Sequence, residues 1–485
     1  MVMGELELDT EILVIGSGPG GYAAAFRAAD LGFDVTMVDM EPRPGGECLY
    51  RGCIPSKALL YLAGLITSAY KASSMGITFG KPEIDIEKVR AWKKQVIDRL
   101  ADGLVTLTKK RGIQLIQGKA YFESSERVRL QDSEIRHIKF GHAILATGSH
   151  PTPFQDVQYE GGGPIMYSAD ALELRDIPGS LLILGGGYVA LEMGTLYSAL
   201  GSRVTLAVRS DRLLRGADPD IAAPLIKKLG TIFDTIHFNT VAGSLTLSGD
   251  RVLVKFEGKA DKPEQEFDRV LVAMGRRPNS SDIGLENTKV KVDERGFVVT
   301  DEQQRTTDDR IFVVGDVAGG PLLAHKAFHE GKIAAEVIAG EPSAFDVRAI
   351  PAVVYTDPQV AWCGLTEEEA HKRGVSARIE RFPWKFSSRA VTMGAVEGLT
   401  KLIIDPETGR ILGIGIAGHE AEGMISEGAL AIEMGALSTD IALTVHPHPT
   451  LSETVGEAAE IFLGTSTHIM PKAGRSKLDD LSPKA

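Results

Sequence analysis

The chain has 485 residues, of which 24% are charged and 43% hydrophobic, and its formal net charge is -12. This length exceeds what one hydrophobic core supports, so three or four globular units are expected. The acidic balance argues against a nucleic-acid partner, because phosphate binding requires a basic surface. Apolar stretches are interrupted short of the roughly 20 residues that a membrane-spanning helix needs, so no membrane span is expected.

The number of cysteines indicates the redox environment in which the protein works. Three cysteines are too few for a disulfide scaffold and favour a reducing environment, so a cytoplasmic location is expected. The acidic N-terminus runs directly into a predicted strand, which is not the pattern of a secretory signal. No metal site is predicted. Residues 471–485 are polar and lack apolar periodicity, so a flexible tail is predicted.

A strand–glycine turn–helix–strand pattern occurs twice, at residues 11–39 and 181–209. The strands are continuous apolar runs, as expected of buried parallel strands, so the chain is predicted to hold two dinucleotide-binding folds in succession. A helical stretch over about 54–112 and short alternating strands separate the two copies. Residues 311–315 add one more strand, and everything from 346 onward indicates a separate α+β unit.

The predicted fold class is therefore α/β, with two Rossmann-like dinucleotide-binding domains and a C-terminal α+β domain. The predicted boundaries are 1–152 for the first nucleotide domain, 153–275 for the second, 276–345 for a central segment that completes the first, 346–470 for the last domain and 471–485 for the tail.

The first glycine motif is G-S-G-P-G-G. Gly16 permits the tight turn, Gly18 lets the backbone approach a pyrophosphate, and Gly21 lets the helix pack closely on the strand. The helix N-terminus offers free N–H groups to phosphates, and the carboxylate of Asp39 can accept hydrogen bonds from ribose hydroxyls. The alternative is an ordinary tight turn. The strand before, the helix after and the acid at the right distance favour a dinucleotide site.

The second glycine motif differs where nucleotide specificity is set. Gly185 and Gly187 hold its first two positions, but Ala190 takes the third, and the following strand ends without a carboxylate for a ribose 2′-hydroxyl. Arg209 and Arg215 lie in a short loop and could clamp a 2′-phosphate through their guanidinium groups, which favours NADP over NAD. The alternative is that both are solvated surface arginines.

Cys48 and Cys53 lie in the segment G-G-E-C-L-Y-R-G-C-I-P-S-K. Five residues of ideal helix rise about 7.5 Å, too far for a disulfide, so the pair can form one only if residues 49–52 depart from a helix. Gly52 supplies that freedom, and Pro55 suits the first turn of a following helix. Cys53 is then expected at a helix N-terminus, where the dipole stabilises a thiolate, which predicts a redox pair. The alternative is two buried structural thiols.

Together these pieces resemble the pyridine nucleotide–disulfide oxidoreductases over nearly the whole chain, and the dihydrolipoamide dehydrogenases most closely. The matching motifs are G-S-G-P-G-G, C-x-x-x-x-C-I-P-S-K-A-L-L, A-T-G-S, G-R-R-P-N, V-G-D-V-A-G-G-P-L-L-A-H-K-A and H-P-H-P-T-L-S-E. The resemblance implies FAD in the first unit, a nicotinamide nucleotide in the second, and a homodimer whose last domain forms the interface. It implies electron transfer between a lipoyl disulfide on a carrier protein, or a free lipoamide-like one, the cysteine pair, FAD and NAD(P).

The resemblance also implies roles for individual residues. Lys57 and Glu192 would pair beside the flavin, and His448 and Glu453 would serve the disulfide of the other subunit. The implied FAD contacts are Gly16, Gly18, Gly21, Asp39, Gly46, Ala120, Thr147, Gly148, Asp316, Leu323, Ala324 and His325. The implied NAD(P) contacts are Gly185, Gly187, Tyr188, Val189, Ala190, Glu192, Val208, Arg209, Arg215 and Gly275.

The residues around His448 indicate a catalytic role for it independently of the resemblance. It lies between Pro447 and Pro449, which restrict its backbone and hence its ring position. A histidine beside a dithiol can accept and return its proton near neutral pH, and Glu453 could hold the imidazole in one tautomer. The alternative for Glu453 is structural, because Thr450-Leu-Ser-Glu453 is a capping-box pattern that would open the final helix.

The chain departs from the dihydrolipoamide dehydrogenase pattern at two places. Tyr50 and Arg51 stand where Asn-Val is common. The set Tyr188, Ala190, Arg209 and Arg215 resembles instead the NADPH-type site of glutathione reductase. Four functions therefore stay open: oxidation of protein-bound dihydrolipoamide, NADPH-driven reduction of another small or protein disulfide, a flavin-dependent diaphorase, and a redox-silent nucleotide-binding sensor.

Overall fold

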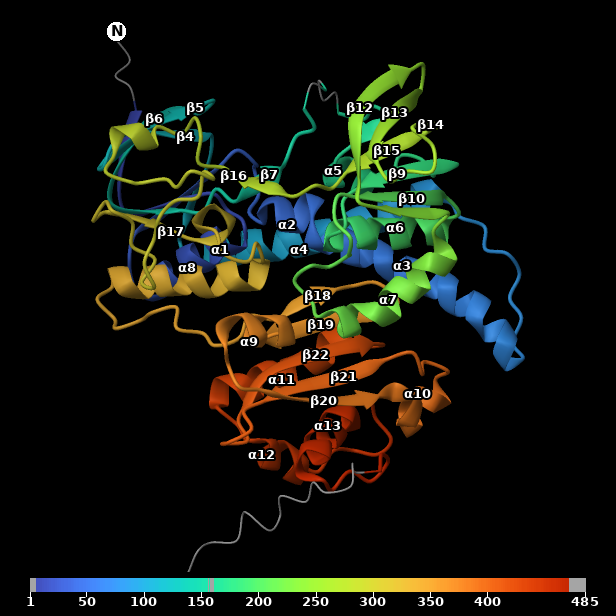
Figure 1. Cartoon of the computed structure of the whole chain (residues 1–485). Coiled ribbons are helices and arrows are strands. Elements are labelled where there is room, and N and C mark those ends of the chain that lie inside the picture. Colours follow the sequence, from blue (N-terminus) through green and yellow to red (C-terminus); the bar gives the residue numbers. More distant parts are fainter. Residues whose placement is uncertain (1–5, 156, 158–160, 471–485) are drawn as a thin grey trace, which may run out of the picture.

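The computed structural model describes residues 6–155, 157 and 161–470, so the predicted tail at 471–485 lies outside the described residues. Figure 1 shows two sheet-and-helix units side by side and a third unit, in orange and red, packed beneath them. The fold is α/β with two Rossmann-like units and a C-terminal α+β domain, as the sequence predicts. The exact domain boundaries drawn from the sequence stay predictions.

The first unit is built on a sheet with the strand order β3-β2-β1-β6-β5-β4, to which β17 adds by pairing with β6. Its central strand β1 runs parallel to β2 and β6, and Ile12, Leu13 and Val14 on it are fully buried, which explains the continuous apolar run in the sequence. The elements of this unit are β1 (Leu6–Ile15), α1 (Pro19–Asp30), β2 (Val35–Asp39), β3 (Gln114–Gln117), β4 (Lys119–Ser124), β5 (Arg127–Gln131), β6 (Ile135–Leu145), η2 (Leu285–Asn287), β17 (Ile311–Val313), η3 (Gly315–Ala318) and α8 (Ala324–Ile338).

The second unit repeats this design with a parallel sheet of order β11-β10-β9-β15-β8 and a separate antiparallel sheet β12-β13-β14. Its elements are β8 (Ile165–Met166), α5 (Ser168–Glu173), β9 (Ser180–Leu184), α6 (Tyr188–Leu200), β10 (Arg203–Val208), α7 (Pro219–Ile232), β11 (Thr235–Phe238), β12 (Thr240–Ser248), β13 (Arg251–Gly258), β14 (Glu264–Phe267) and β15 (Arg269–Val272). A two-stranded ribbon joins the two units, formed by β7 (Ser149–Pro151) and β16 (Arg276–Pro278).

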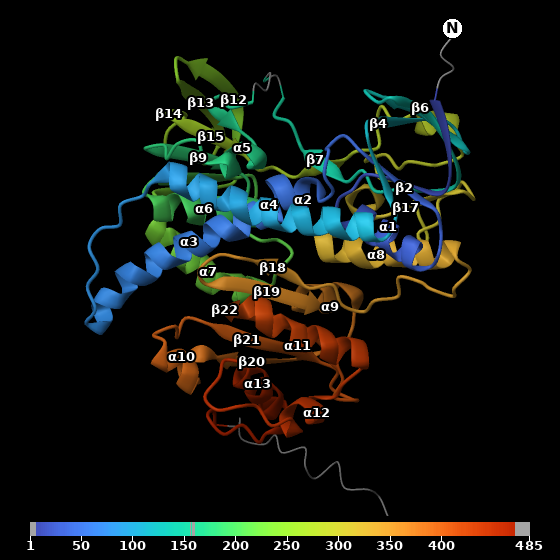
Figure 2. The ribbon, with the colours of Figure 1, turned by 180° about the vertical axis from the view of Figure 1, so that it is seen from behind.

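The stretch predicted as one helical region over 54–112 is two helices with a break between them. The two helices are α3 (Cys53–Ala72), which ends in the short η1 (Ser73–Met75), and α4 (Ile86–Lys110). The short helix α2 (Gly46–Arg51) precedes them. The helical pattern is interrupted at 76–85, where Gly76, Gly80 and Pro82 lie before the amphipathic run that begins at Ile86. Seen from behind, α4 crosses the molecule beside α3 and α2, which it contacts (Figure 2).

One described helical stretch, Gly46–Met75, is apolar and long enough to cross a membrane by length and composition, with a mean hydropathy of 1.2 and 33% of its apolar window buried. The stretch is nevertheless interrupted at Gly52, carries both cysteines at its start, and packs against α6. One such helix is weak evidence for a membrane.

The third unit is a five-stranded sheet of order β18-β19-β22-β21-β20, antiparallel throughout. Helices α11 and α13 pack against its strands, and their contacts form a separate hydrophobic core. Its elements are β18 (Ala352–Val354), β19 (Gln359–Gly364), α9 (Glu367–Arg373), β20 (Arg378–Pro383), η4 (Trp384–Phe386), α10 (Ser388–Thr392), β21 (Leu399–Ile404), β22 (Ile411–Gly418), α11 (Ala421–Met434), α12 (Ser438–Leu443) and α13 (Glu453–Leu463).

A close helix crossing in the first unit gives a test of the fold. A Cβ at Gly331 on α8 would lie 2.3 Å from the carbonyl oxygen of Gly20 on α1. We expect Gly331→Ala to lower the free energy of unfolding by roughly 1–3 kcal/mol because it overpacks this crossing. The control Gly230→Ala, on α7, meets no atom within 4 Å and should raise it by roughly 0.5–1 kcal/mol, the ordinary helix propensity difference. Equal effects of the two changes in denaturant unfolding would contradict the packing described.

Candidate active site

A cavity of about 700 Å³ opens where the first two units meet. It is lined by the first glycine turn, by the starts of α2 and α3, by residues of α6 and by the segment after β17. The predicted site residues that line it are Gly16, Gly18, Asp39, Gly46, Cys48, Cys53, Lys57, Ala120, Thr147, Gly148, Tyr188, Val189, Glu192, Asp316 and Ala324. The structure thus brings together most of the residues predicted for FAD and the cysteine pair.

Glycine is required on the floor of the cavity. Gly16 has φ 99°, and a Cβ there would lie 2.4 Å from the carbonyl oxygen of Ala146. A Cβ at Gly46 would lie 2.5 Å from Cα of Gly18, and one at Gly21 would lie 1.8 Å from the carbonyl oxygen of Gly16. Gly18 caps α1 without a side-chain hydrogen bond, so the first N–H groups of that helix face the turn without a side-chain partner. The turn fits the pyrophosphate of a dinucleotide.

Asp39 is held in place by its own neighbours. Its Oδ2 accepts hydrogen bonds from the backbone N–H of Ser17 at 2.6 Å and from Ser17 Oγ at 2.7 Å, and its Oδ1 accepts one from the N–H of Glu41 at 2.8 Å. Each carboxylate oxygen keeps lone-pair capacity. The carboxylate at the end of β2 is thus oriented toward the cavity before any ribose hydroxyl arrives.

Three residues that sequence reasoning missed connect Asp316 to the cysteine helix. Ser149 Oγ donates to Asp316 Oδ2 at 2.6 Å and accepts from Nε of Arg276 at 2.7 Å. Nη2 of Arg276 donates to Oε1 of Glu47, the residue before Cys48, at 2.7 Å. All three line the cavity. Arg276 belongs to the motif G-R-R-P-N, which predicted a domain boundary and matched the family but did not indicate which side chains it would join.

The cysteine pair sits at a break between two helices. Helix α2 continues through residues 49–51, and the break before α3 is confined to Gly52. A Cβ at Gly52 would lie 3.0 Å from the carbonyl oxygen of Glu47 and 3.2 Å from Cα of Cys48, so a larger residue there would crowd the preceding turn. Cys53 is the first residue of α3, as predicted. Both cysteines are free thiols in the structure and face the same cavity.

The pKa values of the two thiols are shifted in opposite directions. The hydrogen bond from Cys48 lowers the pKa of Cys53 to about 7, burial opposes this shift, and the ammonium of Lys57 adds to it. The same hydrogen bond, together with burial, raises the pKa of Cys48. Near neutral pH the geometry therefore favours a thiolate on Cys53 and a protonated Cys48.

Lys57 is held by residues of two other units. Its Nζ lies 2.9 Å from Oε2 and 3.1 Å from Oε1 of Glu192 on α6, and the Glu192 side chain is only 3% exposed. The same Nζ lies 4.4 Å from the ring centroid of Tyr355, just after β18, and the N–H of Tyr355 donates to Oε1 of Glu192 at 3.0 Å. The predicted Lys57–Glu192 pair forms, and Tyr355, which sequence reasoning missed, completes it.

The second glycine turn lies at the edge of the cavity rather than inside it. Gly185 has φ 140°, and a Cβ there would lie 2.2 Å from the carbonyl oxygen of Ala273. A Cβ at Gly186 would lie 2.8 Å from Cγ1 of Val208, so Gly186, which was not predicted, also requires glycine. Predicted nucleotide residues outside the cavity lining are Gly185, Gly187, Ala190, Val208, Arg209, Arg215 and Gly275.

The three arginines of the loop after β10 differ in their partners. Arg212 Nη2 lies 2.8 Å from Oε2 of Glu368 in the third unit. Arg209 and Arg215 are exposed and form no ion pair or side-chain hydrogen bond with the part of the chain that the structure describes. Both guanidinium groups are therefore available to an anionic ligand.

His448 and Glu453 do not line the cavity of their own chain. His448 Nδ1 lies 2.8 Å from Glu453 Oε1, and the histidine side chain is 64% exposed. Glu453 Oε2 accepts from the N–H of Thr450 at 2.6 Å, but the Thr450 hydroxyl donates to the carbonyl oxygen of Pro447 and α13 begins at Glu453. Half of the capping box offered as an alternative therefore forms: Glu453 accepts from the Thr450 N–H, but the Thr450 hydroxyl bonds to Pro447 in place of the Glu453 N–H, and the other Glu453 oxygen holds the imidazole.

Two predicted FAD contacts on α8 lie outside the lining. Leu323 precedes the helix as its N-cap, and Nε2 of His325 pairs with the carbonyl oxygen of Pro351 at 2.7 Å. Their neighbour Ala324 does line the cavity. Burial lowers the pKa of His325, which favours its neutral form.

A cysteine pair beside a lysine, in a cavity shared by two Rossmann-like units, defines a flavin- and nicotinamide-dependent oxidoreductase of disulfides. Comparison with known proteins agrees with that class. Residues 10–331 match the family model of the pyridine nucleotide-disulphide oxidoreductases, and residues 350–459 match the dimerisation domain of the same family. The chain belongs to this family, and its cofactors are FAD and a pyridine nucleotide.

Curated relatives and solved structures extend over the whole fold. The chain is 43% identical over 473 residues to a dihydrolipoyl dehydrogenase of Vibrio cholerae, covering 97% of this chain and 99% of the relative. It is 41% identical over 474 residues to the dihydrolipoyl dehydrogenase of Bacillus subtilis, covering 97% and 100%. The structure of LpdA from Mycobacterium tuberculosis superposes with a TM-score of 0.85 at 26% identity, covering 93% of this chain and 99% of that one. The flavoprotein disulfide reductase RclA from Escherichia coli gives 0.82 at 25% identity, with the same coverage.

The lowered pKa of Cys53 can be tested by measuring its rate of alkylation against pH. In the reduced protein, we expect iodoacetamide to modify Cys53 at a rate that rises with pH around a midpoint of about 7. In Cys48→Ala the midpoint should move upward, because the hydrogen bond that stabilises the thiolate is lost. Cys363 is an internal control, since burial raises its pKa to about 12 and it should stay unmodified. A Cys53 midpoint at or above the ordinary thiol value of about 8.5 would contradict the geometry.

Proposed function

We propose that this enzyme oxidises the dihydrolipoyl group of a carrier protein, or a free lipoamide-like dithiol, and passes the electrons to a nicotinamide nucleotide. The observation that carries the proposal is the Cys48–Cys53 pair beside Lys57 in a cavity that both nucleotide units line. The lipoyl substrate is supported by the dihydrolipoyl dehydrogenases that resemble the chain over 97% of its length.

The cysteines would perform the exchange with substrate. A thiolate of the dithiol attacks Sγ of Cys48 in the disulfide form of the pair, and Cys53 leaves as a thiolate. The second substrate sulfur then attacks the first, which releases the oxidised substrate and leaves Cys48 as a thiol. Two electrons have moved to the protein, and the low pKa of Cys53 makes it the better leaving group. FAD, when bound, supplies the two-electron transfer from the thiols to the nicotinamide.

FAD would be held by groups that the structure already orients. The glycine turn and the N-terminus of α1 suit the pyrophosphate, Asp39 suits the adenosine ribose, and Asp316, held by Ser149, suits hydroxyls of the flavin side chain. Lys57, Glu192 and Tyr355 stand at the junction of this cavity with the second unit. These residues fit the cofactor that the family uses.

Proton transfer would require a second copy of the chain. His448 lies outside the cavity of its own subunit, and no described residue hydrogen-bonds to its Nε2, whereas Glu453 holds Nδ1. The third unit matches the family's dimerisation domain, which supports a homodimer in which His448 of one subunit serves the cysteines of the other. The imidazole would accept the proton of the attacking thiol there.

The cytoplasmic location expected from the cysteine count stays a prediction.

NADP is the preferred nucleotide in this proposal. Arg209 and Arg215 lie in the loop that follows β10, where a ribose 2′-substituent is recognised in this fold, and neither forms an ion pair or side-chain hydrogen bond with another described residue. The same arginines favour a second candidate function, in which NADPH drives the reduction of another small or protein disulfide. The chemistry at Cys48 and Cys53 is then the same and runs in reverse.

The role of Cys48 can be tested by a single replacement. Cys48→Ser should abolish turnover of dihydrolipoamide while reduced nucleotide still bleaches the flavin absorbance, because only the exchange with substrate needs this sulfur. Cys363→Ser is the matched control and should leave turnover unchanged, since that buried thiol lies outside the cavity. Retained turnover of dihydrolipoamide in Cys48→Ser would refute the role of Cys48, and a flavin that nucleotide cannot reduce would leave a redox-silent sensor.

Nucleotide choice can be tested with kcat/KM for dihydrolipoamide oxidation, comparing NADP⁺ with NAD⁺. We expect a preference for NADP⁺. Arg209→Gln and Arg215→Gln should each lower kcat/KM for NADP⁺ by about ten- to a hundredfold, the cost of one charge-assisted hydrogen bond, and change it little for NAD⁺. Arg99→Gln, which removes an exposed charge on α4, should change neither. A preference for NAD⁺ that both arginine variants leave intact would refute the NADP assignment.

A further inference from the structure

The loop that carries Arg209 and Arg215 runs from the end of β10 to the start of α7 and is anchored at its centre. Leu213, Leu214 and Ala217 are buried, and the N–H of Leu214 donates to the carbonyl oxygen of Gly186 at 3.0 Å. Leu214 has φ 46°, a conformation that non-glycine residues adopt only when their surroundings enforce it. Arg215 follows Leu214 directly, Arg209 opens the loop, and both are exposed, so the position of the loop backbone sets the region that their guanidinium groups can reach.

The surroundings that enforce this conformation come partly from the third unit. Arg212 pairs with Glu368 at 2.8 Å, and the carboxylate of Asp218 accepts hydrogen bonds from the N–H groups of Glu367 and Glu368 at 2.9 and 3.2 Å. Those N–H groups belong to the first turn of α9, whose partial positive charge suits a carboxylate. A Cβ at Gly216 would lie 3.3 Å from the ring of Trp362 on β19. The loop is thus clamped against the third domain at several of its residues.

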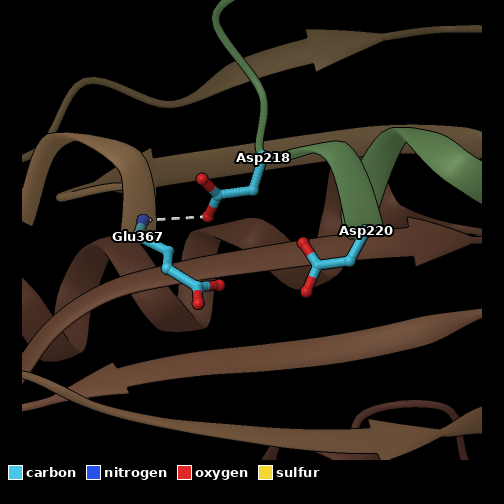
Figure 3. Close-up of side chains that lie close together, drawn as sticks. All are labelled: Asp218, Asp220 and Glu367. Carbon is cyan, nitrogen blue, oxygen red and sulfur yellow. Dashed lines mark hydrogen bonds between the residues drawn. The ribbon is translucent and has the colours of Figure 1, made fainter. Parts of the chain in front are cut away.

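Figure 3 shows the end of this clamp, where the carboxylates of Asp218, Asp220 and Glu367 converge from two domains. Three carboxylates this close require a cation. The ammonium of Lys401 on β21 supplies it, since Nζ lies 2.9 Å from Asp218, 2.9 Å from Asp220 and 2.5 Å from Glu367, and its side chain is 1% exposed. Arg381 adds a second cation, 2.6 Å from Asp220 and 2.5 Å from Glu367. The three carboxylates are therefore paired with cations of the chain itself.

We propose that Lys401 and Glu368 are specificity-determining residues of the nucleotide site, because they hold the loop 209–218 in the position from which Arg209 and Arg215 reach a 2′-phosphate. This inference rests on the proposed NADP function. Neither residue contacts the nucleotide: both are positioning residues that act through Asp218 and Arg212. A guanidinium group displaced by about 1 Å loses most of its advantage for one phosphate. The part that NADPH shares with NADH binds at the glycine turn, which meets the loop through the Leu214–Gly186 hydrogen bond and carries neither arginine, so it depends on the loop less than the 2′-phosphate does.

Glu368→Gln is the first test, because Glu368 is partly exposed and its replacement leaves no buried charge unpaired. With the FAD-loaded protein and lipoamide as acceptor, KM for NADPH should rise about two- to fivefold, the effect of losing one partly exposed ion pair, while KM for NADH and both kcat values change less than that. The control is Glu397→Gln, which removes the Lys227–Glu397 ion pair between the same two domains but does not touch the loop. It should change neither KM.

Lys401→Met is the stronger test, because it removes the cation shared by three carboxylates while keeping the side-chain length. We expect KM for NADPH to rise about tenfold or more and KM for NADH to change less than about twofold. A general loosening of the domain contact would instead raise both values together, and that result would overturn the inference. If Lys401→Met does not fold, the split between the two KM values in Glu368→Gln decides the question.

The inference and the proposed function fail in distinguishable ways. If Arg209→Gln and Arg215→Gln do not discriminate between NADPH and NADH, the NADP assignment fails and the inference falls with it. If those variants discriminate but Glu368→Gln and a folded Lys401→Met do not, the NADP assignment stands and the positioning role is overturned. A rise of KM for NADPH in Glu397→Gln as large as in Glu368→Gln would also overturn it.

Discussion

The site depends on one junction at which all three units of the chain meet. Lys57 comes from the helix that begins with Cys53, Glu192 from the helix of the second nucleotide unit, and Tyr355 from the edge of the third unit. A nearly buried carboxylate is costly unless it is paired and hydrogen-bonded. Glu192 meets that requirement with the ammonium of Lys57 and the N–H of Tyr355, so its position fixes the relative placement of the three units where the chemistry takes place.

The junction has a direct consequence for the cysteine pair. Lys57 cannot move away from Cys53 without leaving Glu192 unpaired, so its positive charge is a fixed part of the thiolate's environment. The hydrogen bond from Cys48 and the N-terminus of α3 act in the same direction. Glu47, linked through Arg276 and Ser149 to Asp316, restrains the other end of the short cysteine helix. The pair is therefore held from both sides by residues of other segments.

Sequence patterns predicted those parts of the site that are formed by residues close together in the chain. The two glycine turns, the helix that starts at Cys53 and the carboxylate at Asp39 each depend on backbone geometry within a few residues. The predicted Lys57–Glu192 pair came from resemblance, since its members are 135 residues apart. Tyr355, Arg276 and Lys401 were missed for the same physical reason: each acts on residues brought near only by the packing of separate units. The half-formed capping box and the interruption at 76–85 show that competing local hydrogen bonds and turn residues override short helical patterns.

The central claim is that electrons pass between nicotinamide nucleotide and the Cys48–Cys53 pair. The most direct measurement is to treat the FAD-loaded enzyme anaerobically with one equivalent of NADPH, alkylate it with iodoacetamide and map the modified cysteines by mass spectrometry. When the pair is first oxidised to its disulfide, the account predicts that Cys48 and Cys53 are unmodified before NADPH is added. After NADPH is added, Cys53 and then Cys48 become modified, with Cys363 unmodified throughout. Alkylation of the pair without NADPH, or none with it, would contradict the account.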